Sequence, residues 1–225
     1  GKGSPQQTKE MKDARVYHHT SAQSSISRRY LQGRDVCRYR LEWAGQWLEY
    51  GANLAATRVS QIFEGERIIV RQIPSRPPYC INAALTTEDY VHDINSNVVL
   101  DVKEITTYSL LAILNSRMVS CWFVHYFDKL QRKTFPQFKT NELELFPVPN
   151  LTPDDVSILD SLCRQIMDFE NTRAGHTKGF SAHESVSRQI HKVEMRIEEV
   201  LAQHYGLSLV EREYINEYHK QYLSD

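Results

Sequence analysis

The stretch TYSLLAILNSRMVSCWFVHYF, residues 107–127, decides the fold class of this chain of 225 residues. Its apolar side chains recur at spacings of three and four, which places them on one face of an α-helix. The pattern predicts a long helix from roughly Thr107 to Phe127 that packs through that face. The apolar positions are Leu110, Leu111, Leu114, Met118, Cys121, Trp122 and Phe127.

Upstream of this stretch the pattern is typical of strands. The run ERIIVRQI, residues 66–73, is rich in β-branched residues, has the length of a strand and is followed by three prolines. Shorter apolar pieces occur around Ile81 and over residues 98–100, separated by Thr, Asp and Asn. We therefore expect a small sheet between about residues 34 and 100.

Downstream, the sequence is helical after a rigid exit at FPVP, residues 146–149. TPDD, residues 152–155, places a capping Thr, a first-turn Pro and two acids at a helix start. A second apolar period runs over residues 186–201 and is stopped by Gly206. SLVE, residues 208–211, is a capping box that opens a third helix. We expect the two longer helices to form an antiparallel pair.

These patterns predict an α+β fold, with a small mixed sheet and a long packed helix followed by a C-terminal helical segment. We predict a polar tail or linker over residues 1–27, an α/β unit over 28–150 and a helical scaffold over 151–225. The chain begins with GKGS and no Met, so we expect it to be a piece of a longer protein.

The charge is divided unevenly between the two larger units. Lys and Arg outnumber Asp and Glu by 19 to 15 up to Asn150, and are outnumbered 8 to 13 after it. The net charge of -1 excludes a uniformly basic nucleic-acid binder but leaves room for a basic face. Two basic stretches that also hold aromatic residues, 28–40 and 129–139, suit a polyanion, and a solvated charged face is the alternative.

Cysteine usage and hydropathy indicate an intracellular protein. Cys37, Cys80, Cys121 and Cys163 lie about 40 residues apart without a CxxC pair, which argues against a zinc knuckle or a disulfide scaffold. We expect reduced thiols and a cytoplasmic location. No apolar run approaches the roughly 18 residues of a membrane span, so we expect no membrane partner.

No catalytic motif is recognisable in the sequence, which has no GxGxxG, Walker, HExxH or GxSxG pattern. SRPPY, residues 75–79, superficially resembles the Asn/Asp-Pro-Pro-Tyr loop of amino-group methyltransferases. Arg76 can only donate where that loop needs an acceptor. Glu64, Glu66 and Lys103 stay open as the acids and Lys of a metal nuclease. We predict no catalytic residue and no metal site in this chain.

Five segments in order resemble the C-terminal specificity domain of TaqI-like and type IIG restriction-modification enzymes, over about residues 28–218. They are LQGRDVCRY at 31–39, ERIIVRQI at 66–73, LLAILNSR at 110–117, the stretch 135–149, and VLAQHYGL at 200–207 with Glu211. The first is similar to the family's opening segment, and the third to its Leu-Leu-x-Leu-Leu-Asn-Ser helix. The last is similar to its closing Tyr-Gly-Leu helix pair.

The resemblance implies a sequence-specific recognition domain for double-stranded DNA, in a bacterial or archaeal type II (IIG/IIS-like) restriction-modification enzyme. Residues 28–150 would be the DNA target recognition domain. The implied partners are DNA and an N-terminal, adenine-specific methyltransferase domain of the same parent chain, which flips its target base. S-adenosylmethionine is implied for that parent, and Mg if it cleaves; no cofactor is expected in this chain.

Candidate DNA contacts follow from the side chains that suit each part of a duplex. We expect phosphate contacts from Arg34, Arg38, Lys129, Arg132, Lys133 and Lys139. We expect base-edge contacts from Arg71, Arg76, Gln72, Gln131 and Gln137. For Arg71, a cross-strand ion pair is an equally open interpretation. Asn115 and Ser116 are expected to cap or pack within the long helix.

Two other functions stay open from the residues alone. A non-catalytic protein-interaction module would bind no duplex and show little salt sensitivity. A small metal-dependent nuclease would show metal-dependent turnover by the isolated chain. For the DNA-recognition domain, we expect the acidic helical part to repel phosphates and to serve as a scaffold that packs on the sheet part or against the catalytic neighbour.

Overall fold

The computed structural model describes residues 7–127 and 137–222, and it has the predicted α+β fold. The strands are β1 (His18–His19), β2 (Ser27–Leu31), β3 (Val36–Cys37), β4 (Arg40–Leu41), β5 (Trp47–Glu49), β6 (Arg67–Arg71), β7 (Ala83–Thr86), β8 (Tyr90–His92) and β9 (Ser96–Val99). The helices are α1 (Lys9–Asp13), α2 (Thr107–Leu114), α3 (Arg117–Phe127), α4 (Thr140–Leu143), α5 (Pro153–Ala174), α6 (Ser181–His204) and α7 (Leu209–Glu217). Short 3₁₀ turns are η1 (Gly33–Asp35), η2 (Ser60–Phe63) and η4 (Tyr218–Tyr222).

The strands form three small sheets rather than one. A four-stranded sheet has the order β1-β5-β2-β8 and is mixed, because β2 and β8 are parallel. A β3-β4 hairpin and an antiparallel sheet of order β7-β6-β9 complete the set. Alternate residues of β6 serve two layers: Ile68 and Val70 pack toward the helices, and Ile69 packs toward β2 and β3.

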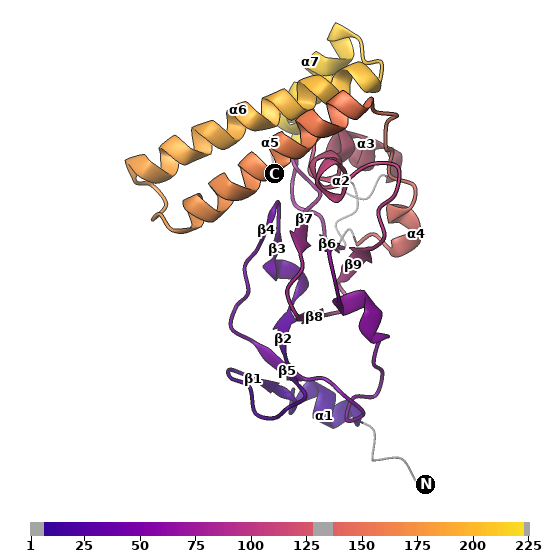
Figure 1. Cartoon of the computed structure of the whole chain (residues 1–225), viewed down its shortest axis with the longest axis vertical. Coiled ribbons are helices and arrows are strands. Elements are labelled where there is room, and N and C mark those ends of the chain that lie inside the picture. The colour runs from indigo at the N-terminus through magenta and orange to yellow at the C-terminus, as the bar shows by residue number, and fades with distance from the viewer. Residues whose placement is uncertain (1–6, 128–136, 223–225) are drawn as a thin grey trace.

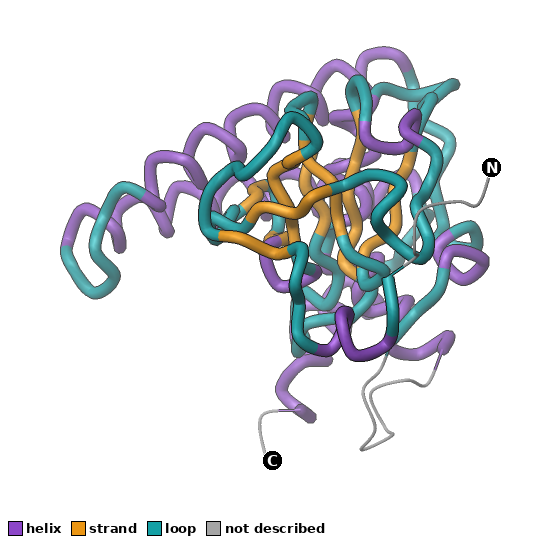
Figure 2. The backbone as a smooth tube through the Cα atoms, turned by 90° about the horizontal axis from the view of Figure 1, so that it is seen from below, coloured by secondary structure: helices purple, strands orange, loops and turns teal. Residues whose placement is uncertain are grey.

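The largest core lies between the β7-β6-β9 sheet and the helices. It joins Ile68 of the sheet and Leu111 of α2 with Leu159 of α5 and Ile197 of α6, all at most 1% exposed. One core therefore spans both sides of the boundary predicted at residue 150, and the helical part packs on the sheet part. Figure 1 shows α5 and α6 side by side across one end of the molecule, with the N-terminal segment at the other end. Figure 2 shows the strands grouped together, with the helical pair extending beyond them on one side.

The stretch 107–127 forms two helices instead of the long one predicted. The Asn115 amide donates to the Ala83 carbonyl at 2.9 Å and accepts from the Ala83 N–H at 3.0 Å, so it bonds to β7. Ser116 Oγ accepts from Val119 N at 3.1 Å and caps α3. Glu198 of α6 adds acceptors for the N–H groups of Arg117 (2.5 Å) and Met118 (3.3 Å). Contacts with β7 and α6 thus divide a continuous apolar period.

The start signals predicted for the later helices are confirmed. Thr152 Oγ1 accepts from Asp155 N, and Pro153 opens α5. Ser208 and Glu211 form the capping box of α7. In the part of the chain that the structure describes, no helix is both long and apolar enough to cross a membrane.

Residues 1–27 were predicted as a polar tail, and the described part of them holds α1 and β1. β1 pairs antiparallel with β5, where His18 lies opposite Leu48. Residues 20–26 are exposed. Part of the predicted tail is therefore a component of the four-stranded sheet.

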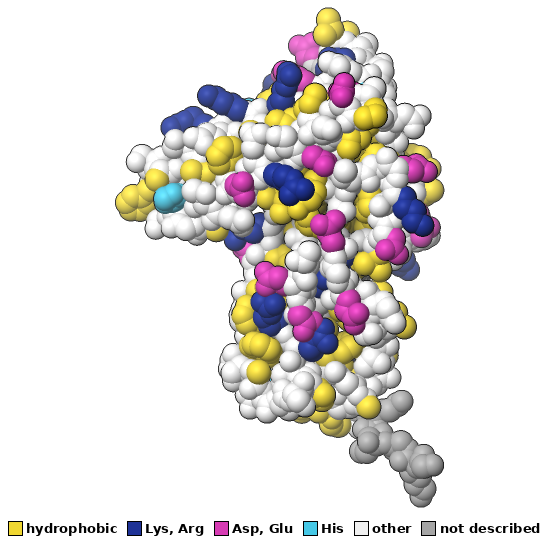
Figure 3. All heavy atoms as spheres, viewed as in Figure 1, with side chains coloured by type: hydrophobic (Ala, Val, Ile, Leu, Met, Phe, Trp, Pro, Cys, Tyr) yellow, Lys and Arg dark blue, Asp and Glu magenta, His cyan; other side chains and the backbone are white. Residues whose placement is uncertain are grey.

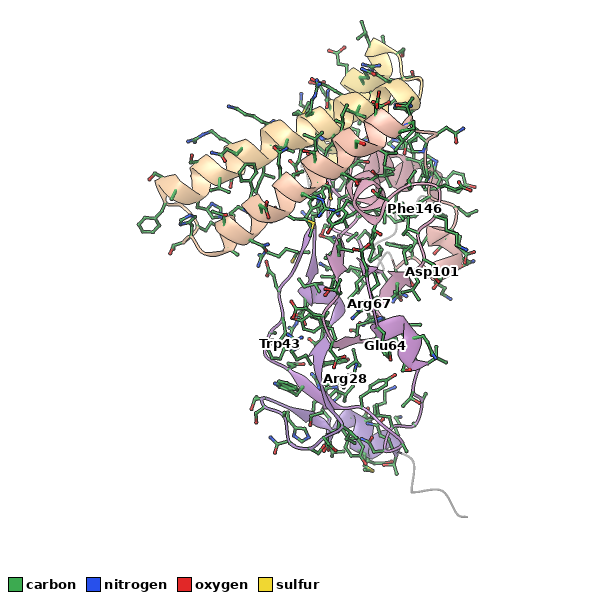
Figure 4. All side chains as sticks on the ribbon, in the orientation of Figure 1. Arg28, Trp43, Glu64, Arg67, Asp101 and Phe146 are labelled. Atoms are coloured by element: carbon green, nitrogen blue, oxygen red, sulfur yellow. The ribbon has the colours of Figure 1, made fainter. Side chains whose placement is uncertain are left out.

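Arg67 of β6 joins two of the sheets. Its side chain is fully buried and donates to the backbone carbonyls of Gly65 (2.8 Å), Glu88 (2.7 Å) and Tyr90 (3.3 Å). Burial lowers the pKa of its guanidinium. Figure 4 shows Arg67 in the middle of the sheet part, so this cation has a structural function.

Candidate nucleic-acid interface

Four amide side chains gather where β6 ends, and we call Gln72, Asn95, Asn97 and Gln137 the amide cluster. Gln72 Nε2 donates to Asn97 Oδ1 at 2.9 Å. Gln137 Nε2 donates to Gln72 Oε1 at 2.8 Å and to Asn95 Oδ1 at 3.1 Å. The Thr140 hydroxyl donates to Asn97 Oδ1 at 3.0 Å. The cluster thus joins three segments that are distant in sequence.

The backbone fixes the segment that carries Gln137. Phe138 N donates to the Gln72 carbonyl at 3.0 Å. The Phe138 ring is fully buried and lies 5.4 Å from the ring of Phe123 and 5.5 Å from that of Phe146, centroid to centroid. Phe138, which the sequence placed in a basic surface stretch, therefore anchors this segment in the core.

The turn between β8 and β9 supplies Asn95. The Asp93 carboxylate accepts from Asn95 N (2.9 Å), Asn95 Nδ2 (3.1 Å) and Gly33 N (3.2 Å). Gly33 lies so close that an added Cβ would stand 3.1 Å from both Cβ and O of Asn95. The close approach explains this glycine and brings η1, with Arg34, against the turn.

Three cations stand next in the chain to a residue of the amide cluster or to a residue that positions it. Arg34 follows Gly33, Arg71 precedes Gln72 and Lys139 follows Phe138; Arg34 and Lys139 are exposed and Arg71 is half-buried. Across residues 7–127 and 137–222, none of the three side chains forms an ion pair. Arg71 lies opposite Ser96 of β9, so the cross-strand ion pair considered for it is not formed among the described residues.

The other arginines of the stretch 28–40 are neutralised by acids. Arg28 pairs with Asp89, Arg29 pairs with Glu88 at 2.7 Å, and Arg40 pairs with Glu42. Figure 3 shows blue and magenta side chains alternating over the sheet part on the face in view. Most of the basic excess read from this stretch is therefore cancelled at the surface, and Arg34 is the exception.

Arg38, predicted to contact phosphate, lies at the junction between the sheet part and α6. Its side chain is 17% exposed, pairs with Glu194 at 2.7 Å and donates to the Asn115 carbonyl at 3.1 Å. Its guanidinium carbon lies 3.6 Å from the centroid of the Tyr79 ring. These contacts hold Arg38 away from the amide cluster and give it a structural function.

Five predicted DNA contacts remain: one lies in the loop after β6, and four lie outside the described residues. Arg76 is exposed in the loop after β6, where Pro78 and Tyr79 contact η4 and α6. Four of the predicted contacts lie outside the described residues and stay predictions. They are Lys129, Gln131, Arg132 and Lys133.

The chemistry of the cluster is that of hydrogen bonding and charge. In the described part of the chain, no group of three or more His, Cys, Asp or Glu residues is placed to hold a metal ion. Glu66, considered as a nuclease acid, accepts from the Thr107 hydroxyl at 2.6 Å. Glu64 and Asp101 project from separate segments in Figure 4. The amides and guanidinium groups instead match the donors and acceptors of base edges and phosphates.

Asn95, Asn97 and Thr140 were not among the contacts predicted from the sequence. For Asn95, the local sequence DINSN, residues 93–97, indicates a turn, because Asp and Asn are typical of turns. Nothing local indicates that Asn95 meets Gln137, because that contact depends on the packing of Phe138.

A model of the TaqI-like C-terminal specificity domain matches residues 28–148. This chain belongs to that family. The family predicted from five ordered segments is thereby confirmed, and the matched residues contain the whole amide cluster and its three neighbouring cations.

One solved structure with a similar fold is the type IIL restriction-modification enzyme MmeI in complex with DNA. The TM-score is 0.57 at 10% sequence identity, over 95% of this chain and 33% of that one. The chain therefore spans about a third of the length of that structure, and the likeness is one of fold. A search of curated proteins found no match to this chain.

Proposed function

We propose that this chain is a target recognition domain that contacts the base edges of double-stranded DNA through the amide cluster. The observation that carries the proposal is the hydrogen-bonded meeting of four amides in a member of the specificity-domain family, on segments that also carry Arg71 and Lys139. Arg34 follows Gly33, which packs against Asn95. Asn and Gln pair with adenine, Arg pairs with guanine, and exposed cations neutralise phosphates. One good bidentate contact discriminates between bases by about 1–3 kcal/mol.

The proposal extends to the parent protein. We infer a bacterial or archaeal, cytoplasmic type II enzyme of the IIG/IIS-like class, in which an adenine-specific methyltransferase domain precedes this chain. That domain would use S-adenosylmethionine, and Mg would serve the parent only if it cleaves. The recognition domain would hold the methyltransferase on its target.

The helical part fits the function of a scaffold. Residues 151–225 carry 8 Lys and Arg against 13 Asp and Glu, which disfavours contact with phosphates. α5 and α6 share the main core with the β7-β6-β9 sheet, and Arg38 pairs with Glu194 at the junction. The helices thereby fix the sheet that presents the amide cluster.

Selection from a randomised duplex pool at low and moderate salt tests the function. We expect one enriched motif for the wild-type chain. Gln72→Ala should relax one position of it. Lys139→Ala should weaken all sequences alike and make the salt dependence shallower by about one unit in the log–log slope.

Lys192→Ala is the matched control, because Lys192 is an exposed lysine on α6 and lies in the helical scaffold. We expect it to bind as the wild type does. Absence of duplex binding at either salt by a folded chain would contradict the proposal. Metal-dependent cleavage by the isolated chain would favour the nuclease.

One observation favours the interaction module as second candidate. A groove of about 340 Å³ between α3 and α7 is lined by apolar side chains that include Trp122, Leu207 and Ile215. Grooves of this kind accept apolar segments of partner proteins. A chain that captures such a segment and binds no duplex would support this alternative.

A further inference from the structure

The turn between β8 and β9 carries an isoleucine between Asp93 and Asn95. Ile94 is 73% exposed. Single exposed apolar side chains are ordinary on protein surfaces and need no explanation by themselves. Ile94 lies in a turn whose backbone is tied to two sheets, beside side chains that can contact DNA.

The backbone on both sides of Ile94 is tied to two sheets. Asp93 N donates to the Leu31 carbonyl of β2 at 3.0 Å, and Gln72 N donates to the Asn95 carbonyl at 2.8 Å. The Asp93 carboxylate closes the turn on Asn95, and Gly33 packs against Asn95 from η1. A β-branched side chain has few χ1 rotamers, so Ile94 is directed outward with little freedom to lose on binding.

The neighbours of Ile94 are the groups proposed to contact DNA. Asn95, the next residue, belongs to the amide cluster, and Arg34 follows Gly33, which packs against Asn95. Amides and guanidinium groups detect hydrogen-bond donors and acceptors. They do not detect the C5-methyl group that thymine presents in the major groove, whereas an apolar side chain does.

We propose that Ile94 is a specificity-determining residue that contacts the C5-methyl group of a thymine in the major groove. The inference rests on the proposed function and adds to it a contact with a named base. Burial of one methyl group predicts a preference of about fourfold for thymine over its demethylated analogue at one position.

Deoxyuridine substitution tests this contact, since it removes only the methyl group. Each thymine of the selected duplex is replaced in turn, and the Kd is measured for the wild type, Ile94→Ala and Leu209→Ala. Leu209 is the matched control, because it is 81% exposed at the start of α7. We expect one replacement to weaken the wild type and the control about fourfold, and Ile94→Ala to bind both duplexes equally.

The outcomes separate this inference from the function on which it rests. If the wild type selects a motif and Ile94→Ala keeps its preference for thymine over deoxyuridine, Ile94 does not contact the methyl group and DNA recognition stands. If no replacement of thymine weakens binding by the wild type, Ile94 likewise does not contact a methyl group, and DNA recognition stands. If the folded wild type selects no motif, both proposals are overturned.

Discussion

The amide cluster and the sheet–helix junction are two polar regions of the molecule that serve different purposes. In the junction, which we define as Arg38, Tyr79, Glu194 and Glu198, the two partners of the Arg38–Glu194 pair are 17% and 8% exposed. In the amide cluster the amides bond to one another, and the adjoining Arg34 is exposed. A buried charge is stable only with its partner, whereas an exposed cation stays hydrated until a polyanion displaces its water and counterions.

Arg34 and Arg38 show how little the local sequence says about this difference. They stand four residues apart in one basic stretch, and both were predicted to contact phosphate. Arg38 meets Glu194 of α6, whereas Arg34 follows the glycine that packs against the β8–β9 turn. The junction therefore stabilises the fold, whereas the amide cluster is suited to binding. Substitutions in the two regions should differ accordingly in their effect on stability.

The largest effect is expected from Arg38→Ala. It leaves the Glu194 carboxylate buried without its cation, which should lower the free energy of unfolding by about 3–5 kcal/mol. Arg34→Ala is the matched control and should change that free energy by less than about 0.5 kcal/mol. Urea unfolding of both variants measures the difference, and equal effects would contradict the distinction between the two regions.

Next is the pH dependence contributed by Glu198. Burial raises its pKa from 4.5 to about 7, despite the N–H groups of Arg117 and Met118 that lower it. Because the folded state then holds the proton more tightly than the unfolded chain, the stability from this group is complete below about pH 4.5 and is lost as the pH rises through about 7.

The Glu198→Gln variant removes this titration. Its free energy of unfolding relative to the wild type should rise between pH 4.5 and about 7 by roughly 3 kcal/mol. Urea unfolding over that range measures the difference. Parallel pH profiles for the two proteins would show that Glu198 does not titrate in this window.

A smaller effect is expected from Asn115→Ala. It removes both hydrogen bonds to Ala83 and leaves the buried Ala83 N–H without its partner, whereas the Ala83 carbonyl keeps the Tyr39 N–H, so the change should cost about 2 kcal/mol. Asn141→Ala, on an exposed residue of α4, should change stability far less. Thermal or urea unfolding of the two variants compares them, and equal stabilities would mean that α2 and α3 do not depend on the bond to β7.

The smallest effect on stability is expected from Gln72→Ala, because its amide is only half-buried and water can replace it. We expect a loss of at most about 1 kcal/mol in urea unfolding, together with the relaxed base preference described above. A loss as large as that of Arg38→Ala would place the amide cluster among the structural contacts, like the junction.

Much of the fold was predictable, since its signals are local. The run at 66–73 contains β6, and the capping residues Thr152 and Ser208 open α5 and α7 as expected. The break at Asn115 was not predictable, because the apolar period continues through it and the amide bonds to a strand distant in the sequence.

For the candidate site, the sequence alone determined the residue types and the family: ordered segments with clustered cations and glutamines. Periods and caps depend on neighbours within one turn or one strand, so they can be recognised without a fold. Tertiary structure alone decided which cations are neutralised and which amides meet. Burial and pairing depend on distant residues, as in the contacts of Arg38 with Glu194 and of Gln72 with Gln137.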